Sequence, residues 1–424
     1  MKQQKRQYKS QLVVIGSGLA GFAASIFAHD RGINTAQIGN TGAVAYTTGY
    51  FDLLGVDQDG VLDNPWQGLD GLRRQAPEHP LSRIGEDDVR TAFCRFTAAL
   101  SEMGIGYTSP GPHNVMALLP SGVVKPTLSL PLTMQAGAEA YRTGARTLIA
   151  GFVGMQGFSA KEMVANLKPT WADLRATTLT FPDMESGAQL YPEVMARALE
   201  VPANRARLAV CIKAALGDAT CVGLPAILGI HAPDFVHGEM EKLIGVPLFE
   251  IPTLPPAVPG IRLREMFEQA LPAMGLTLVP QQKAKRLDFT DNGATVYLDD
   301  SFGEVVIEAE AAVLATGRFL SGGLIADHST VRESLMDISV FQPDNREDWH
   351  RQHYFDPRGH PINRSGINVD AHNRPLAADG KPVHHRLFAA GTVLAHQDWV
   401  RQRCGAGVAI TSAYQAVKAV SEIL

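Results

Sequence analysis

The feature that most constrains this chain is a set of three glycines near its start, in the segment VVIGSGLAGFAAS. Gly16, Gly18 and Gly21 follow the apolar run Leu12–Ile15 and open a helical stretch of small residues. In this strand–turn–helix context the first glycine allows a tight turn, the second lets a phosphate approach the backbone, and the third lets helix and strand pack closely. The N–H groups and the positive end of the helix then hold the phosphate. The spacing predicts a dinucleotide or flavin site, although a helix of small residues that packs without a ligand produces the same pattern.

The carboxylate that usually accompanies this motif is missing. It is expected at the end of the second strand, about 20 residues on, where it binds the ribose of an adenosine. The second strand is predicted at Thr35–Ile38, the residues GNTG follow it, and no Asp or Glu lies between Asp30 and Asp52. The sequence therefore predicts a phosphate site without the usual contact to adenosine.

Composition excludes several classes of protein. The 424 residues are 45% hydrophobic and 19% charged, which is typical of a soluble globular protein of two or three domains. A net charge of −5 gives no reason to expect nucleic acid as a partner. The four cysteines form no CxxC pair, so we expect neither an iron–sulfur cluster nor a zinc site held by this chain alone. Few cysteines without a pattern are typical of proteins in a reducing compartment.

The basic N-terminus resembles a secretory signal, because four cations precede an apolar stretch. The three glycines interrupt that stretch, so we expect a cytoplasmic protein. No run of about 18 apolar residues occurs elsewhere, and membrane association would have to come through a partner.

The order of predicted elements indicates two α/β parts. A helix is predicted at about Asp87–Met103, and β/α alternation from Thr147 to about residue 230 predicts a small sheet with crossover helices. A second helix follows Ile261, then a short strand LTLVP, then a hairpin with Asn292-Gly293 at its turn. We predict a flavin-binding domain from residues 1–110 and 258–424, with an α/β domain inserted at 111–257.

Two further segments converge with the first glycine motif. The strand VLATG ends at Gly317, and the strand LFAAGT reaches Gly391 before a final helix that begins near Gly405 and Gly407. This order resembles the flavoproteins with two dinucleotide-binding domains, such as the flavoprotein subunits of fumarate reductase and succinate dehydrogenase. The resemblance implies a Rossmann-like α/β fold with a smaller inserted α/β domain. A helix N-terminus beside the flavin would stabilise the negative charge of its reduced form.

Longer strings narrow the family. The segments LDGLRRQAPEHPLSRIG (69–85), IPTLPPAVPGIRL (251–263), ATGRFLSGGL (315–324), GINVDAHNRPL (366–376) and QRCGAGV (402–408) are similar to those of the B subunit of anaerobic glycerol-3-phosphate dehydrogenase. That family implies a catalytic A subunit and a membrane-associated iron–sulfur C subunit as partners, and a peripheral place at the inner membrane through them. It also implies FMN rather than FAD. The missing carboxylate agrees, since FMN offers a phosphate but no adenosine ribose.

The residues expected to contact the cofactor come from all of these segments. They are Gly16, Gly18, Gly21, Thr47, Thr48, Gly317, Gly391, Gly405 and Gly407. Thr47 and Thr48 follow the second strand and would hydrogen-bond the flavin or its phosphate; capping of a turn is the alternative role.

Oxidation of glycerol 3-phosphate needs a base for the 2-hydroxyl and cations for the phosphate. His396 is the candidate acid or base by position, and Arg262 is the candidate anion ligand between a proline-rich turn and a helix. Arg401 and Arg403 are further candidates for a phosphate or a redox partner. Each of these side chains has an alternative role as a structural or solvated group.

Two versions of the function remain open. In one, this chain oxidises glycerol 3-phosphate itself to dihydroxyacetone phosphate. In the other, its flavin relays electrons from the A subunit toward the iron–sulfur subunit and quinone. The sequence favours the relay, because it shows no clear cluster of a catalytic base with substrate-binding arginines. The alternatives are a free-standing flavin oxidoreductase for another small acid and a structural subunit without flavin.

Overall fold

The computed structural model describes residues 6–40, 43–184 and 189–424, and these divide into two compact units. The first unit takes the chain up to Ala43, then Asp52–Phe96 and Phe267–Leu424, and the second takes Val44–Phe51 and Thr97–Met266. Both long crossings lie inside helices, α3 (Glu86–Glu102) and α9 (Val258–Ala273), whereas the sequence placed the boundaries at 110/111 and 257/258. The short segment Val44–Phe51 was not expected to belong with the insertion.

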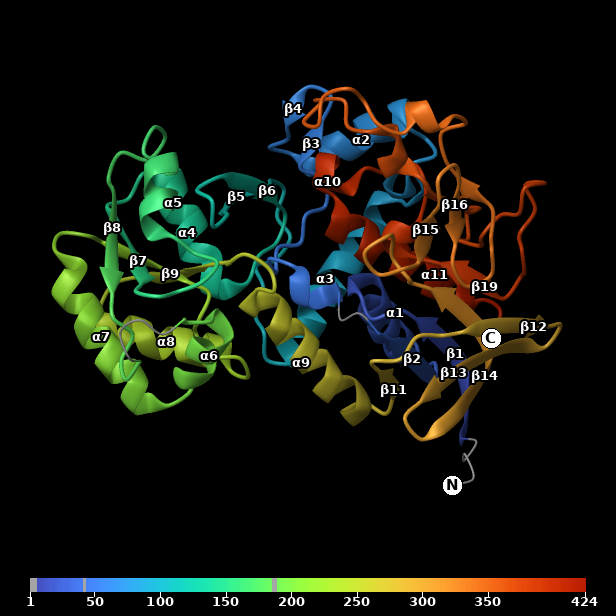
Figure 1. The fold of residues 1–424 in the computed structure, drawn as a ribbon, viewed down its shortest axis with the longest axis horizontal. Coiled ribbons are helices and arrows are strands. Elements are labelled where there is room, and N and C mark those ends of the chain that lie inside the picture. Colours follow the sequence, from blue (N-terminus) through green and yellow to red (C-terminus); the bar gives the residue numbers. More distant parts are fainter. Residues whose placement is uncertain (1–5, 41–42, 185–188) are drawn as a thin grey trace. The chain divides into compact units, whose positions relative to one another are not determined.

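The first unit is built on a seven-stranded sheet (Figure 1). Five of its strands are parallel, in the order β11-β2-β1-β14-β19. Their bounds are β11 (Thr277–Pro280), β2 (Thr35–Gly39), β1 (Arg6–Ile15), β14 (Gly303–Leu314) and β19 (Leu387–Ala389). In chain order these are the third, second, first, fourth and fifth strands, so the sheet is doubly wound and its order reverses between β1 and β14.

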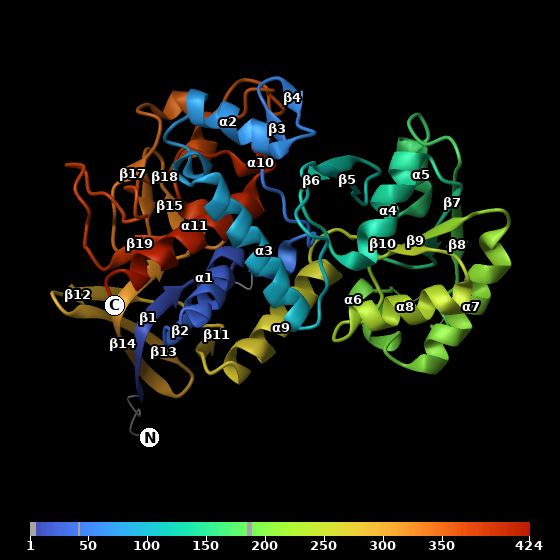
Figure 2. The same ribbon diagram turned by 180° about the vertical axis from the view of Figure 1, so that it is seen from behind.

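The strand β14 is long enough to hold two neighbours on one side. Its first half pairs antiparallel with β13 (Gly293–Asp300), which continues to β12 (Arg286–Thr290), and its last three residues pair with β19. On its other side β14 pairs with β1 from Arg6–Val305 to Ile15–Leu314, and Figures 1 and 2 show these two strands side by side. The central strands are apolar because both of their faces are covered, and Leu12 is fully buried.

Helices α1 (Leu19–Asp30) and α11 (Gly405–Ser421) pack along each other and against β1 and β19. Small residues allow the close packing, and every residue of α1 from Ala20 to Ala28 is buried. The unit also contains α2 (Pro65–Gln75), α10 (Trp399–Gln402), and the short strands β3 (Val56–Asp57), β4 (Gly60–Val61), β15 (Leu324–Ala326), β16 (Val331–Glu333), β17 (Val340–Phe341) and β18 (Gly366–Ile367).

The second unit is a smaller sheet of four parallel strands in the order β10-β9-β7-β8. Their bounds are β7 (Thr147–Phe152), β8 (Leu174–Leu179), β9 (Cys221–Pro225) and β10 (Leu248–Ile251). The other elements of this unit are β5 (Val115–Leu118), β6 (Val124–Thr127), α4 (Leu132–Thr143), α5 (Ala160–Leu167), α6 (Pro192–Ala198), α7 (Pro202–Leu216) and α8 (Pro233–Ile244). This sheet too is doubly wound, with its reversal between β7 and β9.

The predicted architecture, a Rossmann-like α/β fold with a smaller inserted α/β domain, is confirmed by these two sheets. The hairpin near residue 292 is also present, but its turn is one residue earlier than predicted. Thr290 pairs with Gly293, so Asp291 and Asn292 form the turn. Gly293 is needed for another reason: a Cβ there would collide with the carbonyl group of Ala309 on β14.

Candidate functional site

Three turns meet where the parallel strands of the first unit end. The Ala315 N–H donates to the Ile15 carbonyl at 2.8 Å, and the Ala390 N–H donates to the Leu314 carbonyl at 2.9 Å. The turns after β1, β14 and β19 therefore start at one edge of the sheet, beside the point where the strand order reverses. Open α/β sheets bind ligands at this place.

Glycines allow these turns to approach one another. Gly16 has a φ of +140°, and a Cβ there would lie 2.5 Å from the Ala315 carbonyl carbon. A Cβ on Gly21 would lie 2.9 Å from the Gly16 carbonyl carbon, and one on Gly391 would lie 2.6 Å from the Ala20 Cβ. The roles predicted for Gly16 and Gly21 from the motif, a tight turn and close packing of helix on strand, agree with this geometry.

Gly18 differs from its neighbours because the space beside it is open. It is the N-cap residue of α1, and in the described part of the chain no atom lies within 4 Å of where its Cβ would be. Within the same ranges, no side chain caps the helix and its first turn contains no acidic residue. The first N–H groups of α1 are therefore free to donate hydrogen bonds to an anion.

Two hydroxyl groups lie on these turns, and neither is among the site residues predicted from the sequence. The buried Oγ atoms of Ser17 and Thr316 have no hydrogen-bond partner among residues 6–40, 43–184 and 189–424. Thr316 is close to the first turn, because its backbone nitrogen would lie 3.2 Å from a Cβ on Gly16. An unsatisfied buried hydroxyl is unfavourable unless a ligand completes it. The open glycine, the uncapped helix and these hydroxyls fit the phosphate of a flavin nucleotide.

The end of β2 has no carboxylate and no room for one. The strand ends at Gly39, one residue later than the predicted end at Ile38, and Gln37 in the same strand is buried with its amide donating to the Gly16 carbonyl at 2.9 Å. A Cβ on Gly39 would lie 2.6 Å from the backbone nitrogen of Ser17. Thr41 and Gly42, which belong to the acid-free stretch between Asp30 and Asp52, are outside the described residues.

Gly317, Gly405 and Gly407 lie beside residues other than those of the first glycine turn. Gly317, with a φ of +70°, lies beside the Ser321 hydroxyl. Gly407 donates its N–H to the Asp52 carbonyl at 2.6 Å, and Gly405 packs beside the Trp399 ring. The backbone of Asp52 and Leu53 thus covers part of the start of α11. The contact of Gly405 and Gly407 with a flavin stays a prediction.

Thr47 and Thr48 belong to the second unit. Their hydroxyls accept hydrogen bonds from the Gly49 N–H at 3.2 Å and the Tyr50 N–H at 3.4 Å. This is the turn-capping role that was the alternative for these residues. Their contact with the cofactor stays a prediction.

Arg262 also belongs to the second unit, where it is buried in α9. Its two terminal nitrogens donate to the Glu250 carboxylate at 2.6 and 2.8 Å, and its Nε donates to the Gly229 carbonyl at 2.8 Å. Burial raises the pKa of Glu250, but the charge and hydrogen bonds of Arg262 outweigh it and hold this pKa below its usual value. The guanidinium thus has a protein partner, which weakens the prediction of an anion ligand.

A small pocket lies next to this ion pair. It is lined by Ile105, Tyr107, Pro131, Thr133, Pro233, Asp234, Pro259 and Arg262, and its volume of about 10 Å³ has room for roughly one water molecule. Burial raises the pKa of Asp234. The pocket is too small for an organic substrate.

His396 lies in the loop after β19, in the left-handed region with a φ of +67°. Its Nε2 is 2.7 Å from the Asn368 Oδ1, its Nδ1 is 3.4 Å from the Glu78 carboxylate, and its ring contacts Phe341. Burial lowers the pKa of His396, against the opposing charge of Glu78. The half-buried ring thus has a protein partner near each of its nitrogens, and its role as an acid or base stays a prediction.

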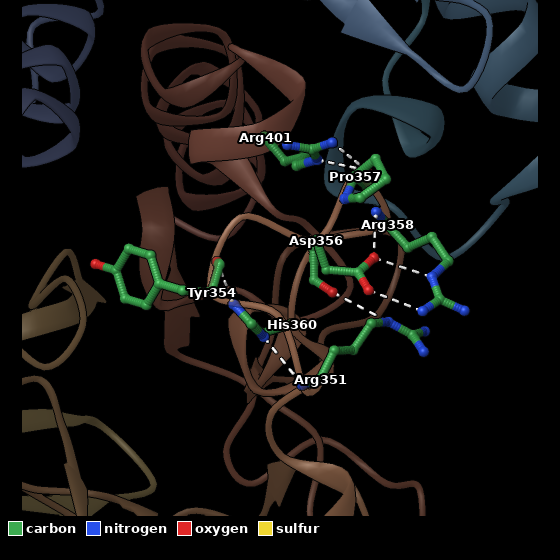
Figure 3. A network of polar contacts seen from close by, with 8 residues as sticks. Arg351, Tyr354, Asp356, Pro357, Arg358, His360 and Arg401 are labelled. Atoms are coloured by element: carbon green, nitrogen blue, oxygen red, sulfur yellow. Dashed lines mark hydrogen bonds and ion pairs between the residues drawn. The ribbon is translucent and has the colours of Figure 1, made fainter.

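Arg401 has contacts that hold a loop in place. Figure 3 shows its guanidinium directed at the Pro357 carbonyl, with an Nε–oxygen distance of 2.6 Å. In the same loop Asp356 accepts from Arg358 at 2.8 and 2.9 Å, and His360 contacts the backbone of Arg351 and Tyr354. One ion pair and several hydrogen bonds to backbone groups thus hold the loop in place. Arg403, with a φ of +50°, ends α10 and is exposed.

The described ranges contain neither a candidate membrane-spanning helix nor a candidate metal site. None of their helices is both long and apolar enough to cross a bilayer. No group of three or more His, Cys, Asp or Glu side chains in these ranges is arranged to hold a metal ion.

Comparison with known proteins supports a flavin site. The model of a family described as FAD binding domain matches residues 11–408. A relative from Halobacterium salinarum, named as the probable B subunit of anaerobic glycerol-3-phosphate dehydrogenase, is 30% identical over 98% of this chain and 99% of its own. The B subunit of anaerobic glycerol-3-phosphate dehydrogenase from Pectobacterium carotovorum is 30% identical over 96% and 98%, and the protein of that name from Yersinia pestis is 29% identical over 98% and 99%.

Similar solved structures are more distant. A 3-ketosteroid Δ1-dehydrogenase from Sterolibacterium denitrificans has a TM-score of 0.45 and 10% identity, covering 98% of this chain and all of the other. A flavocytochrome c3 fumarate reductase has a TM-score of 0.40 and 11% identity, covering 98% of this chain and 78% of the other.

Proposed function

This chain belongs to the FAD binding domain family and, within it, to the family of anaerobic glycerol-3-phosphate dehydrogenase B subunits, and from this premise we propose how its site is used. It is a flavin-dependent dehydrogenase subunit. The proposed reaction is oxidation of sn-glycerol 3-phosphate to dihydroxyacetone phosphate, with the electrons passed to an iron–sulfur subunit and quinone.

The observation that carries the proposal is the edge where three turns meet. Gly18 is open, α1 lacks a side-chain cap within the described ranges, and two buried hydroxyls there have no partner in those ranges. A bound flavin supplies the acceptor for a pair of electrons. The residues proposed to hold it are Gly16, Gly18, Gly21, Gly317 and Gly391, with Gly405, Gly407, Thr47 and Thr48 as candidates of weaker support.

We propose FMN as the preferred flavin. FAD binding through this motif normally uses a carboxylate at the end of the second strand, which contacts the adenosine ribose. This chain has Gly39 there. A mononucleotide does not need that contact.

We propose that this chain relays electrons rather than oxidising the substrate alone. Its partners would be a catalytic A subunit and a membrane-associated iron–sulfur C subunit, which would hold it at the inner membrane. The pairing of Arg262 with Glu250 and the hydrogen bond of His396 to Asn368 favour the relay, because these two candidates already have protein partners. Under the alternative, His396 would be the acid or base for the 2-hydroxyl.

The test is to purify the chain, identify its flavin, and add glycerol 3-phosphate with and without the A subunit. Bleaching that requires the A subunit is expected. Bleaching of the isolated chain would overturn the relay and return the chemistry to this polypeptide. A colourless chain that takes up neither FMN nor FAD would overturn the flavin site itself.

A further inference from the structure

The turn after β1 lies against the last residue of β2. A Cβ added to Gly39 would lie 2.6 Å from the Ser17 nitrogen and closer still to the Ser17 Cβ and Oγ. These separations are below 3.0 Å, which Cβ atoms in proteins do not reach. The side chain of Ser17, together with its backbone nitrogen, therefore occupies the position from which the ribose-binding carboxylate would project.

The hydroxyl of Ser17 also lacks a partner. Its Oγ is buried, and no donor or acceptor in the described part of the chain reaches it. Ser17 immediately precedes Gly18, the open N-cap of α1. A phosphate at that N-terminus would lie beside the hydroxyl, and a hydrogen bond from a hydroxyl to a charged oxygen is strong.

We infer that Ser17 makes this site selective for a flavin that ends at its first phosphate. Its side chain closes the subsite for the adenosine ribose, and its hydroxyl donates to the terminal phosphate in place of that contact. This inference rests on the proposed function, because it requires that the chain bind a flavin and that this flavin be FMN.

Two roles are combined in one residue, and two variants separate them. Ser17→Ala removes the hydroxyl but keeps the Cβ that fills the space over Gly39. Ser17→Gly removes both. Replacement of Gly39 is not informative, because the backbone nitrogen of residue 17 would still collide with any Cβ there.

The experiment is a titration of the full-length apoprotein with FMN and with FAD, followed by flavin fluorescence. The wild type is expected to bind FMN at least about 10-fold more tightly than FAD. Ser17→Ala is expected to weaken FMN binding by about 10- to 100-fold, the loss of one hydrogen bond to a charged group. Ser17→Gly is expected to weaken FMN binding equally and to bind FAD more tightly than Ser17→Ala does.

A matched control is available on the same strand. The Oγ of Ser10 is also buried without a partner in the described ranges, but it lies within β1, away from the turn. Ser10→Ala is expected to keep the wild-type affinity for FMN, and the melting temperatures of all variants show whether they fold.

The outcomes divide clearly. Wild-type FMN affinity in a folded Ser17→Ala would overturn the role of the hydroxyl, and equal affinity of the wild type for FMN and FAD would overturn the selectivity. The first result leaves the proposed function intact, whereas the second also overturns the proposed preference for FMN but leaves the chain a flavin-binding subunit. Failure of the wild type to bind either flavin would instead overturn the proposed function, and this inference with it.

Discussion

The two units contain the same arrangement of strand, turn and helix at the point where their strand order reverses, but they complete the helix end differently. In the first unit, α1 follows β1 through Gly18, with no side-chain cap and no acid in its first turn within the described residues. In the second unit, α5 follows β7 through Ser159, whose hydroxyl accepts from the Glu162 N–H at 3.3 Å. Glu162 also places a negative charge in that first turn.

This difference shows that a doubly wound sheet offers a crevice without making it a ligand site. Capping by Ser159 satisfies a free N–H group of α5, and the Glu162 carboxylate repels an added anion. In the residues that the structure describes, no side chain accepts a hydrogen bond from the first N–H groups of α1 in this way. The chemistry of the helix end, rather than the topology, therefore distinguishes the sheet proposed to bind the flavin from the inserted one.

The largest expected effect comes from closing the first turn. Gly16→Ala places a Cβ against the Ala315 carbonyl at a φ of +140°, so we expect more than about 3 kcal/mol of destabilisation and no flavin binding. Thermal unfolding and flavin titration measure both. Gly32→Ala is the control, since its φ is +70° but its Cβ meets no atom within 4 Å in the described ranges, and it should cost about 1 kcal/mol. Equal effects of the two variants would contradict the role of the close approach.

The next largest effect on stability is expected from a substitution in the second unit. Arg262→Ala leaves Glu250 charged and buried, so we expect a loss of about 3–5 kcal/mol in the free energy of unfolding. Arg197→Ala, which removes ion pairs of an exposed arginine with Glu193 and Glu265, is the control and should cost less than about 1 kcal/mol. Chemical denaturation measures the two. If Arg262→Ala kept full stability but lost substrate turnover, the residue would be an anion ligand after all.

Acid should destabilise the first unit through His79. Burial lowers the pKa of His79 to about 4, below its usual value of 6.5. The unfolded chain binds the proton first, so stability is full above pH 6.5 and falls between pH 6.5 and 4, by roughly 3 kcal/mol in total. His79→Asn keeps a side-chain acceptor for the Leu81 N–H and should flatten this part of the pH profile in denaturant titrations. An unchanged slope would show that other groups cause it.

A smaller effect tests the cap of α5. Ser159→Ala removes the cap and should cost about 1 kcal/mol, with no change in flavin affinity. Urea unfolding and FMN titration of the same preparation give both values. Weakened FMN binding would mean that the second unit contributes to the flavin site, contrary to the contrast between the two helices.

The smallest effect on stability is expected at Gly18. Gly18→Ala adds a Cβ into open space and should change the free energy of unfolding by only about 0.5 kcal/mol. The same Cβ blocks the approach of a phosphate to the backbone, so FMN affinity should fall at least about 10-fold. Unchanged affinity would place the phosphate elsewhere on the sheet edge.

Much of the fold was predictable because its signals are local. The apolar run before Gly16, the helix at α3 and the hairpin of β12 and β13 depend on residues adjacent in the sequence. The boundaries between the units were less predictable, because α3 and α9 continue across them without any break in helical pattern. The 44–51 segment joins the second unit through long-range contacts, such as the Phe51 N–H to the Ser129 carbonyl.

Part of the candidate site was also predictable from the sequence, because the signal for that part is local. The glycine spacing identified the turn, but the role of Arg262 depended on Glu250, whose strand β10 is four residues long and has no distinct pattern. Ser17 and Thr316 stand inside the quoted motifs at positions where the motif accepts any residue. Only the structure shows that their hydroxyls are buried and that Gly39 faces one of them.

The pairing of β1 with β14 also determines the order of events during synthesis. Val13 lies beside Ala312, and at about 5–20 residues per second the ribosome needs roughly 15–60 s to make the chain between them. The whole sheet of the second unit, from Thr147 to Ile251, is complete before β14 exists. Until then this sheet has β11, β2 and β1, and the edge of β1 that β14 later covers is unpaired. The inserted unit is therefore the first part able to fold on the ribosome, and the cofactor sheet is the last.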